Sequence, residues 1–219
     1  MNLEELRLHE IDTVLFDLDG TLIDSLPTIY SLFKRVFLET SKKIVTDEYI
    51  KSLLGPPEEL ILSSCISETA GEKFINYYIN YLTNITDTYD EIRMILHEFK
   101  YNQYNCGLVT NKGTRLATKT LNSMKICEYF DMVVTGDCGY KIKPSSEGLI
   151  HTIHTFGTSP QRTIMIGDTS SDGEAAREAG VWFIHAQWFT LGSYTFCEDS
   201  HFDAFHLDDL YRLLKPCTF

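Results

Sequence analysis

Short apolar runs recur along the chain, and most are separated by stretches with helical spacing. Runs rich in β-branched and aromatic residues are typical of buried strands. The chain contains five of them: Thr13–Asp17, Cys106–Thr110, Met132–Thr135, Thr163–Gly167 and Val181–Ala186. Strands that alternate with helices predict an α/β fold, a Rossmann-like parallel sheet with helices on both faces.

The stretches between the later runs have the composition and spacing of helices. We expect helices at Thr114–Met124, Ser145–Thr155 and Ser171–Ala179. Near the carboxyl terminus, Phe202–Phe205 followed by Leu207–Leu214 predicts a last edge strand and a helix.

One region breaks this alternation, because residues from about 26 to 84 contain no convincing strand. Aromatic residues recur there at helical spacing, as in Phe74, Tyr77, Tyr78 and Tyr81. An insert of about sixty residues is too long for a connecting loop. We therefore expect a helical cap domain at residues 25–85 and an α/β catalytic core formed by residues 1–24 and 86–219.

Composition narrows the function classes. A formal net charge of −12 over 219 residues argues against a nucleic-acid partner or an anionic membrane surface. No segment reaches the ~20 apolar residues of a membrane span, and Met1–Leu6 lacks the features of a secretory signal. The six cysteines have no metal-ligand spacing. We expect a cytoplasmic protein, a monomer or homodimer, without a zinc site or disulfide scaffold.

The first candidate site is the sequence Asp17-Leu18-Asp19-Gly20-Thr21, directly after an apolar run. Residues two apart on a strand face the same way, so Asp17 and Asp19 can address one reacting centre. Two carboxylates held together are costly unless a cation or a proton accompanies them. The pattern favours a metal-bound nucleophile beside a proton-transferring acid. The alternative is an acidic turn followed by a helix cap.

Polar residues also follow the next two runs. Thr110 and Asn111 supply a hydroxyl and a backbone N–H group that could hold an anionic oxygen. Lys141 or Lys143 could neutralise phosphate charge. Alone, the Thr-Asn pair is better explained by a turn, and a lone lysine is usually solvated.

The fourth run ends in Gly167-Asp168, and Asp172 follows four residues later, where a helix is expected. Mg²⁺ prefers a shell of oxygen ligands that includes a few carboxylates. Asp168 suits a direct ligand. Asp172 suits a ligand through water, a partner that orients the lysine, or a helix cap.

Together, these four motifs resemble those of the haloacid dehalogenase superfamily of phosphohydrolases, in the family's order and over essentially the whole chain. The helical insert resembles the cap of the subgroup that contains phosphoglycolate phosphatases, pyrophosphatases and β-phosphoglucomutases. The resemblance implies a Mg²⁺-dependent phosphatase in which Asp17 forms an aspartyl-phosphate. It further implies that Asp19 transfers protons, that Thr110 and Asn111 hold the phosphoryl group, and that Lys143 balances charge.

The same resemblance implies a metal site made of the Asp17 carboxylate, the Asp19 main-chain carbonyl and Asp168, with Asp172 as a further candidate. Either Lys141 or Lys143 can fill the third motif. We favour Lys143 because the family's lysine usually stands directly before a proline.

The substrate expected from the resemblance is a small phosphorylated metabolite. Dehalogenases of the superfamily lack the second carboxylate of the first motif, and Asp19 is present here. Gly55 and Pro56 look like the substrate-facing cap loop, and Glu58 stands where related mutases carry an arginine. We therefore expect hydrolysis of small phosphate monoesters, as in phosphoglycolate phosphatases. The alternatives are a pyrophosphatase, a nucleotidase, or a catalytically weak relative that binds phosphorylated ligands or a protein partner.

Overall fold

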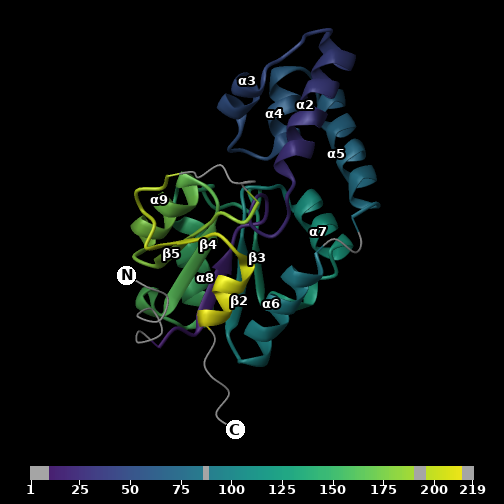
Figure 1. Cartoon of the computed structure of the whole chain (residues 1–219). Helices are drawn as coiled ribbons and strands as arrows, with labels where there is room; N and C mark the ends of the chain where they lie inside the picture. Colours follow the sequence, from purple (N-terminus) through teal and green to yellow (C-terminus); the bar gives the residue numbers. More distant parts are fainter. Residues whose placement is uncertain (1–9, 86–88, 190–195, 214–219) are drawn as a thin grey trace.

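A six-stranded parallel sheet forms the body of the protein in a computed structural model that describes residues 10–85, 89–189 and 196–213 (Figure 1). The strand order is β3-β2-β1-β4-β5-β6, and every neighbouring pair is parallel. The strands are β1 (Thr13–Phe16), β2 (Asn105–Val109), β3 (Met132–Val134), β4 (Thr163–Gly167), β5 (Trp182–Ala186) and β6 (Phe202–Ala204). The predicted α/β fold is confirmed.

The sheet separates two apolar clusters. Val14 and Phe16 of β1 point into one cluster and Leu15 into the other, because side chains alternate along a strand. Helices cover both faces: α8 and α9 contribute to the cluster around Leu15, and α6 and α7 to the opposite one. Their bounds are α6 (Asp90–Tyr101), α7 (Thr114–Ser123), α8 (Glu147–Phe156) and α9 (Ser170–Ala179).

The described chain around the sheet also contains 3₁₀ helices. They are η1 (Cys127–Tyr129), η2 (Pro160–Arg162) and η3 (Leu207–Leu213). The helix expected after β6 is therefore a 3₁₀ helix over its described residues. Its apolar side chains Leu210 and Leu213 are buried against the sheet, which explains the helix-like pattern.

Between β1 and β2 the described chain is helical and contains none of the sheet's strands (Figure 1). We call residues 26–82 the helical insert. It consists of α2 (Leu26–Ser41), α3 (Asp47–Leu53), α4 (Glu58–Cys65) and α5 (Glu68–Leu82). Phe33 of α2 packs edge-on against Phe74 of α5, with ring centroids 5.4 Å apart. The aromatic stripe of the sequence is thus part of the core.

The two chain crossings between the insert and the sheet lie together. The backbone N–H of Asp24 donates to the Tyr89 hydroxyl over 3.3 Å. The boundary expected between the cap and the second part of the core, after residue 85, adjoins residues 86–88, which lie outside the described residues. Met1–Leu6 and Cys217 lie outside them as well. Among the described helices, none is long and apolar enough to cross a membrane.

Candidate active site

The candidate site lies where β1, β2 and β4 end side by side. Asp17 directly follows β1, Thr110 follows β2 and Asp168 follows β4. β1 lies between β2 and β4: the chain runs from β1 through β2 to β3 on one side and then crosses over to β4 on the other side of β1. Ligands of open α/β sheets bind in the crevice outside the strand ends at such a point.

Lys143 connects two of the predicted carboxylates. Its Nζ lies 2.6 Å from Asp17 Oδ1 and 2.6 Å from Asp172 Oδ1, and it donates to the Val109 carbonyl over 2.8 Å. Burial raises the pKa of Asp17 to about 6, although the Lys143 ammonium opposes that shift. Both carboxylates raise the pKa of Lys143, against the effect of its burial. The lysine therefore stays charged in the site.

The structure places Lys143, and not Lys141, beside the first motif. The Lys141 side chain is 80% exposed and pairs with Glu147 over 2.8 Å. The choice between the two lysines made from the sequence agrees with this geometry.

The side chain of Asn111 is hydrogen-bonded to the Lys143 backbone. Its side-chain Nδ2 donates to the Lys143 carbonyl over 3.0 Å, and its Oδ1 accepts from the Lys143 N–H over 2.9 Å. The side-chain amide thus holds the Lys143 backbone in place. Asn111 still lines the cavity described below, so a substrate contact through its backbone is open to it.

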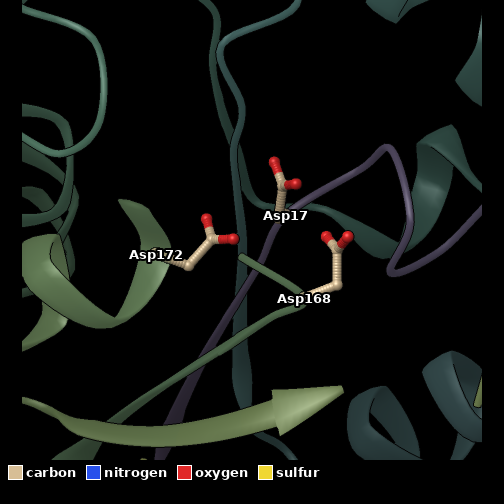
Figure 2. A group of neighbouring side chains, drawn as sticks. All are labelled: Asp17, Asp168 and Asp172. Carbon is tan, nitrogen blue, oxygen red and sulfur yellow. The ribbon is translucent and has the colours of Figure 1, made fainter. Parts of the chain in front are cut away.

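Asp17, Asp168 and Asp172 form a carboxylate cluster (Figure 2). One oxygen from each lies within 4.8 Å of the others. Lost solvation, followed by the charges of Asp172 and Asp17, raises the pKa of Asp168 well above its ordinary value. Ionised carboxylates this close repel each other unless a cation accompanies them. Oxygen donors of this kind fit Mg²⁺.

Within that cluster, Asp172 already has protein partners on both oxygens. Oδ1 accepts from Lys143, and Oδ2 accepts from the Thr169 N–H over 3.0 Å and from its hydroxyl over 2.6 Å. Thr169 and Asp172 form a capping box at the start of α9. Asp172 is thus arranged to orient Lys143 and to cap the helix.

Gly20 brings the first motif close to Asp168. Its φ is +84°, a left-handed conformation that favours glycine. A Cβ atom at this position would come within 2.2 Å of Asp168 Oδ2. The glycine of the first motif is therefore required by backbone conformation and by space.

A second lysine, Lys112, joins Asp19 to the helical insert. Its Nζ lies 3.0 Å from Asp19 Oδ2 and 2.8 Å from Glu58 Oε1, and its side chain has no exposed surface. The sequence motifs do not predict Lys112 as a site residue. The only local signal is a lysine directly after Thr110-Asn111 at a strand end, and its partner Glu58 is 54 residues away in the chain.

A cavity of about 180 Å³ opens onto these groups. Thr110, Lys143 and Asp17 line it from the sheet, and Gly55 and Pro56 line it from the helical insert. Leu26, Ile29 and Leu54 add an apolar wall.

Comparison with known proteins gives this arrangement a family. The sequence profile of haloacid dehalogenase-like hydrolases matches residues 14–186, which include all four motifs. The chain belongs to the haloacid dehalogenase-like hydrolase family. With phosphatases as its curated relatives, it is an enzyme of the phosphatase type in that family, and the predicted resemblance is confirmed.

Two relatives have the same sequence identity to this chain but cover different shares of it. A phosphoglycolate phosphatase of Aquifex aeolicus is 30% identical over 179 residues, covering 80% of this chain and 84% of the relative. The pyrophosphatase PpaX of Bacillus cereus is 30% identical over 209 residues, covering 94% of this chain and 95% of the relative. The family resemblance therefore extends over the helical insert as well as the sheet.

Solved structures share the fold. CbbY of Rhodobacter sphaeroides, in complex with xylulose-(1,5)bisphosphate, superposes with a TM-score of 0.76 at 15% identity, covering 90% of this chain and 95% of that one. A haloacid dehalogenase-like hydrolase of Streptococcus pneumoniae gives 0.67 at 23% identity, covering 94% and 99%. Phosphatases of this family generally use Mg²⁺, and the Asp17–Asp168–Asp172 cluster is compatible with that ion.

Proposed function

We propose that this phosphatase hydrolyses small phosphate monoesters through an aspartyl-phosphate formed on Asp17, with Mg²⁺ as its cofactor. The observation that carries the proposal is the contact between the buried Asp17 carboxylate and the Lys143 ammonium, at 2.6 Å, beside the Asp168 carboxylate. A carboxylate can act as a nucleophile when its charge and position are fixed.

In the first step, an Asp17 oxygen attacks phosphorus and the bond to the leaving oxygen breaks. Asp19 protonates that oxygen, and Thr110 donates its hydroxyl to a phosphoryl oxygen. Lys143 holds Asp17 in position and offsets charge at the reacting centre. In the second step, Asp19 takes a proton from water, which attacks the aspartyl-phosphate and releases inorganic phosphate.

Asp17, Asp168 and the Asp19 main-chain carbonyl would hold the Mg²⁺ ion. When bound, the ion neutralises phosphate charge and lets an anionic substrate approach the Asp17 carboxylate. Asp172 serves this site through Lys143, because both of its oxygens accept hydrogen bonds from protein groups.

The helical insert acts as a cap in this proposal, because Gly55 and Pro56 line the cavity together with the residues at the strand ends. The cavity volume of about 180 Å³ lies below the ~300 Å³ at which typical small-molecule sites begin. A compact leaving group therefore fits better than a nucleoside.

The charges around the cavity favour an uncharged leaving group. Among its described lining residues, the lysines are Lys112 and Lys143, and each is paired with two carboxylates. Glu58 is an acid and cannot hold a second phosphate, as an arginine at this position would. This supports the distinction from sugar-bisphosphate mutases. Phosphoglycolate, the substrate in the name of one relative, belongs to this class of small monoesters although its leaving group carries a carboxylate, and pyrophosphate, in the name of another, is the second candidate.

A substrate panel tests the proposal. Release of phosphate would be measured with Mg²⁺ and with a chelator for p-nitrophenyl phosphate, a short alkyl phosphate, phosphoglycolate, pyrophosphate and a nucleoside monophosphate. We expect Mg²⁺-dependent turnover, the highest kcat/KM for small monoesters, and no turnover by Asp17→Asn. Turnover that survives Asp17→Asn would contradict the mechanism. A preference for pyrophosphate or for the nucleoside monophosphate would contradict the substrate class.

A further inference from the structure

We propose that Lys112 is the positioning residue of Asp19, and that Glu58 and Tyr78 of the helical insert hold Lys112 for this task. The inference rests on the proposed function, in which Asp19 transfers the protons. It adds a physical link between the seating of the insert on the sheet and the proton-transfer step.

The first observation is the geometry around Asp19. Lys112 Nζ donates to both carboxylate oxygens, at 3.1 Å from Oδ1 and 3.0 Å from Oδ2. The Ser25 hydroxyl donates to Oδ1 over 2.5 Å, and the Tyr78 hydroxyl lies 3.5 Å from the same atom. These donors fix the plane of the carboxyl group. The Asp19 side chain is 16% exposed, so a substrate can still reach it.

The second observation is the origin of the groups around Lys112. Glu58 is the first residue of α4, and Tyr78 belongs to α5, so both come from the insert. The ammonium lies 2.8 Å from Glu58 Oε1 and 4.3 Å from the centre of the Tyr78 ring, a cation–π contact. Lys112 itself lies just before α7, on the sheet side. Movement of the insert away from the sheet would therefore remove two partners of Lys112.

The third observation is charge. One buried ammonium faces two carboxylates, and the Asp19 and Glu58 charges both raise the pKa of Lys112 against its burial. A buried cation is stable only when it is paired. Without Glu58, the ammonium would lose one of its two carboxylate partners. Without Lys112, Asp19 and Glu58 would be two acids with no cation between them.

The proton-transfer role of Asp19 can be tested in variants by comparing substrates whose leaving groups differ in basicity. An alkyl phosphate needs a proton on its leaving oxygen, whereas p-nitrophenolate leaves readily without one. Loss of the Asp19 position should therefore lower kcat/KM for the alkyl ester much more than for the aryl ester. General acid catalysis contributes at least roughly 100-fold, so Lys112→Met should show a difference of about that size. Asp19→Asn gives the reference pattern.

Three further variants complete the experiment. Glu58→Gln keeps a hydrogen-bond acceptor for Lys112 but removes the negative charge of the carboxylate. We expect a smaller difference in kcat/KM between the two esters, in the same direction and about ten-fold. Lys112→Arg should recover part of the alkyl-phosphate activity. Lys141→Met, at an exposed lysine outside the site, is the matched control and should change neither substrate. Lys112→Met in the Asp19→Asn background should have no further effect on the difference.

The outcomes separate the inference from the function on which it rests. Equal losses for both esters in Lys112→Met and Glu58→Gln, or no loss, would overturn the positioning role and leave the phosphatase proposal intact. A wild-type enzyme that hydrolyses neither ester would overturn the proposed function itself. If Lys112→Met does not fold by circular dichroism, Glu58→Gln decides, because it retains the buried lysine.

Discussion

The Nζ atom of Lys143 lies 2.6 Å from Oδ1 of Asp17, although the two residues are 126 positions apart in the sequence. The same ammonium binds Asp172, so one buried cation orders two carboxylates from different elements. The nucleophile proposed here is therefore held by the third motif and, indirectly, by the start of α9.

Lys143→Ala should lower kcat strongly, whereas Lys141→Ala should not. The loss of one preorganised charged donor costs about 10²–10³ in kcat. The variant should also be less stable by about 3–5 kcal/mol, because two buried carboxylates lose their cation. Turnover of p-nitrophenyl phosphate and thermal unfolding measure both effects. Undiminished turnover by Lys143→Ala beside an inactive Lys141→Ala would reverse the assignment.

Gly20→Ala should impair metal binding and activity well beyond the cost of backbone strain. The added Cβ would collide with Asp168 Oδ2 at 2.2 Å. Gly139→Ala is the matched control, since Gly139 has φ +97° and nothing within 4 Å of an added Cβ. Both variants carry the left-handed strain of about 1–2 kcal/mol.

The Mg²⁺ concentration for half-maximal activity should rise in Gly20→Ala and stay unchanged in Gly139→Ala. If both variants lose the same amount of stability and neither changes its Mg²⁺ dependence, the added Cβ at position 20 does not displace Asp168.

Asn111→Ala should lower kcat more than it raises KM. The Asn111 side-chain amide makes two hydrogen bonds to the Lys143 backbone. Its removal should therefore loosen the backbone that positions Lys143, without removing a contact to the substrate. Steady-state kinetics on a small monoester separate the two parameters. A rise in KM at constant kcat would instead support the substrate-binding role that the sequence suggested.

The local parts of this site could be predicted from the sequence. Asp17, Thr110 and Asp168 each follow an apolar run, and the position of a strand end depends mainly on that run. The predicted run Thr163–Gly167 is observed with the same bounds as β4. Parallel strands then bring their ends together without further information.

The contacts between distant segments could not be predicted in this way. The sequence places Glu58 beside the cap loop and Lys112 directly after Thr110-Asn111, but only the fold buries the two against each other. The amide of Asn111 reaches Lys143 across 32 residues for the same reason. A buried ion pair or loop clamp depends on tertiary packing, and no local periodicity encodes it.

The Asp17 carboxyl should contribute a loss of stability to the metal-free protein as pH rises from about 4 to about 6, opposite to the gain from acids whose pKa is lowered, such as Glu39 and Asp137. The pKa of Asp17 is raised from 3.8 to about 6, so in this range the folded protein holds a proton that the unfolded chain has released. Stability rises with pH only where the unfolded state binds more protons, and here it binds fewer. The raised pKa of Asp168 acts in the same direction.

Mg²⁺ should reverse this dependence, because it binds the ionised carboxylates in competition with protons. The increase in Tm produced by Mg²⁺ should therefore be larger at about pH 7.5 than at about pH 5. Asp17→Asn, which removes one titrating carboxylate, should weaken both the pH dependence and the Mg²⁺ effect. Equal Mg²⁺ increments at the two pH values in the wild-type protein would show that the cluster does not bind the ion through these carboxylates.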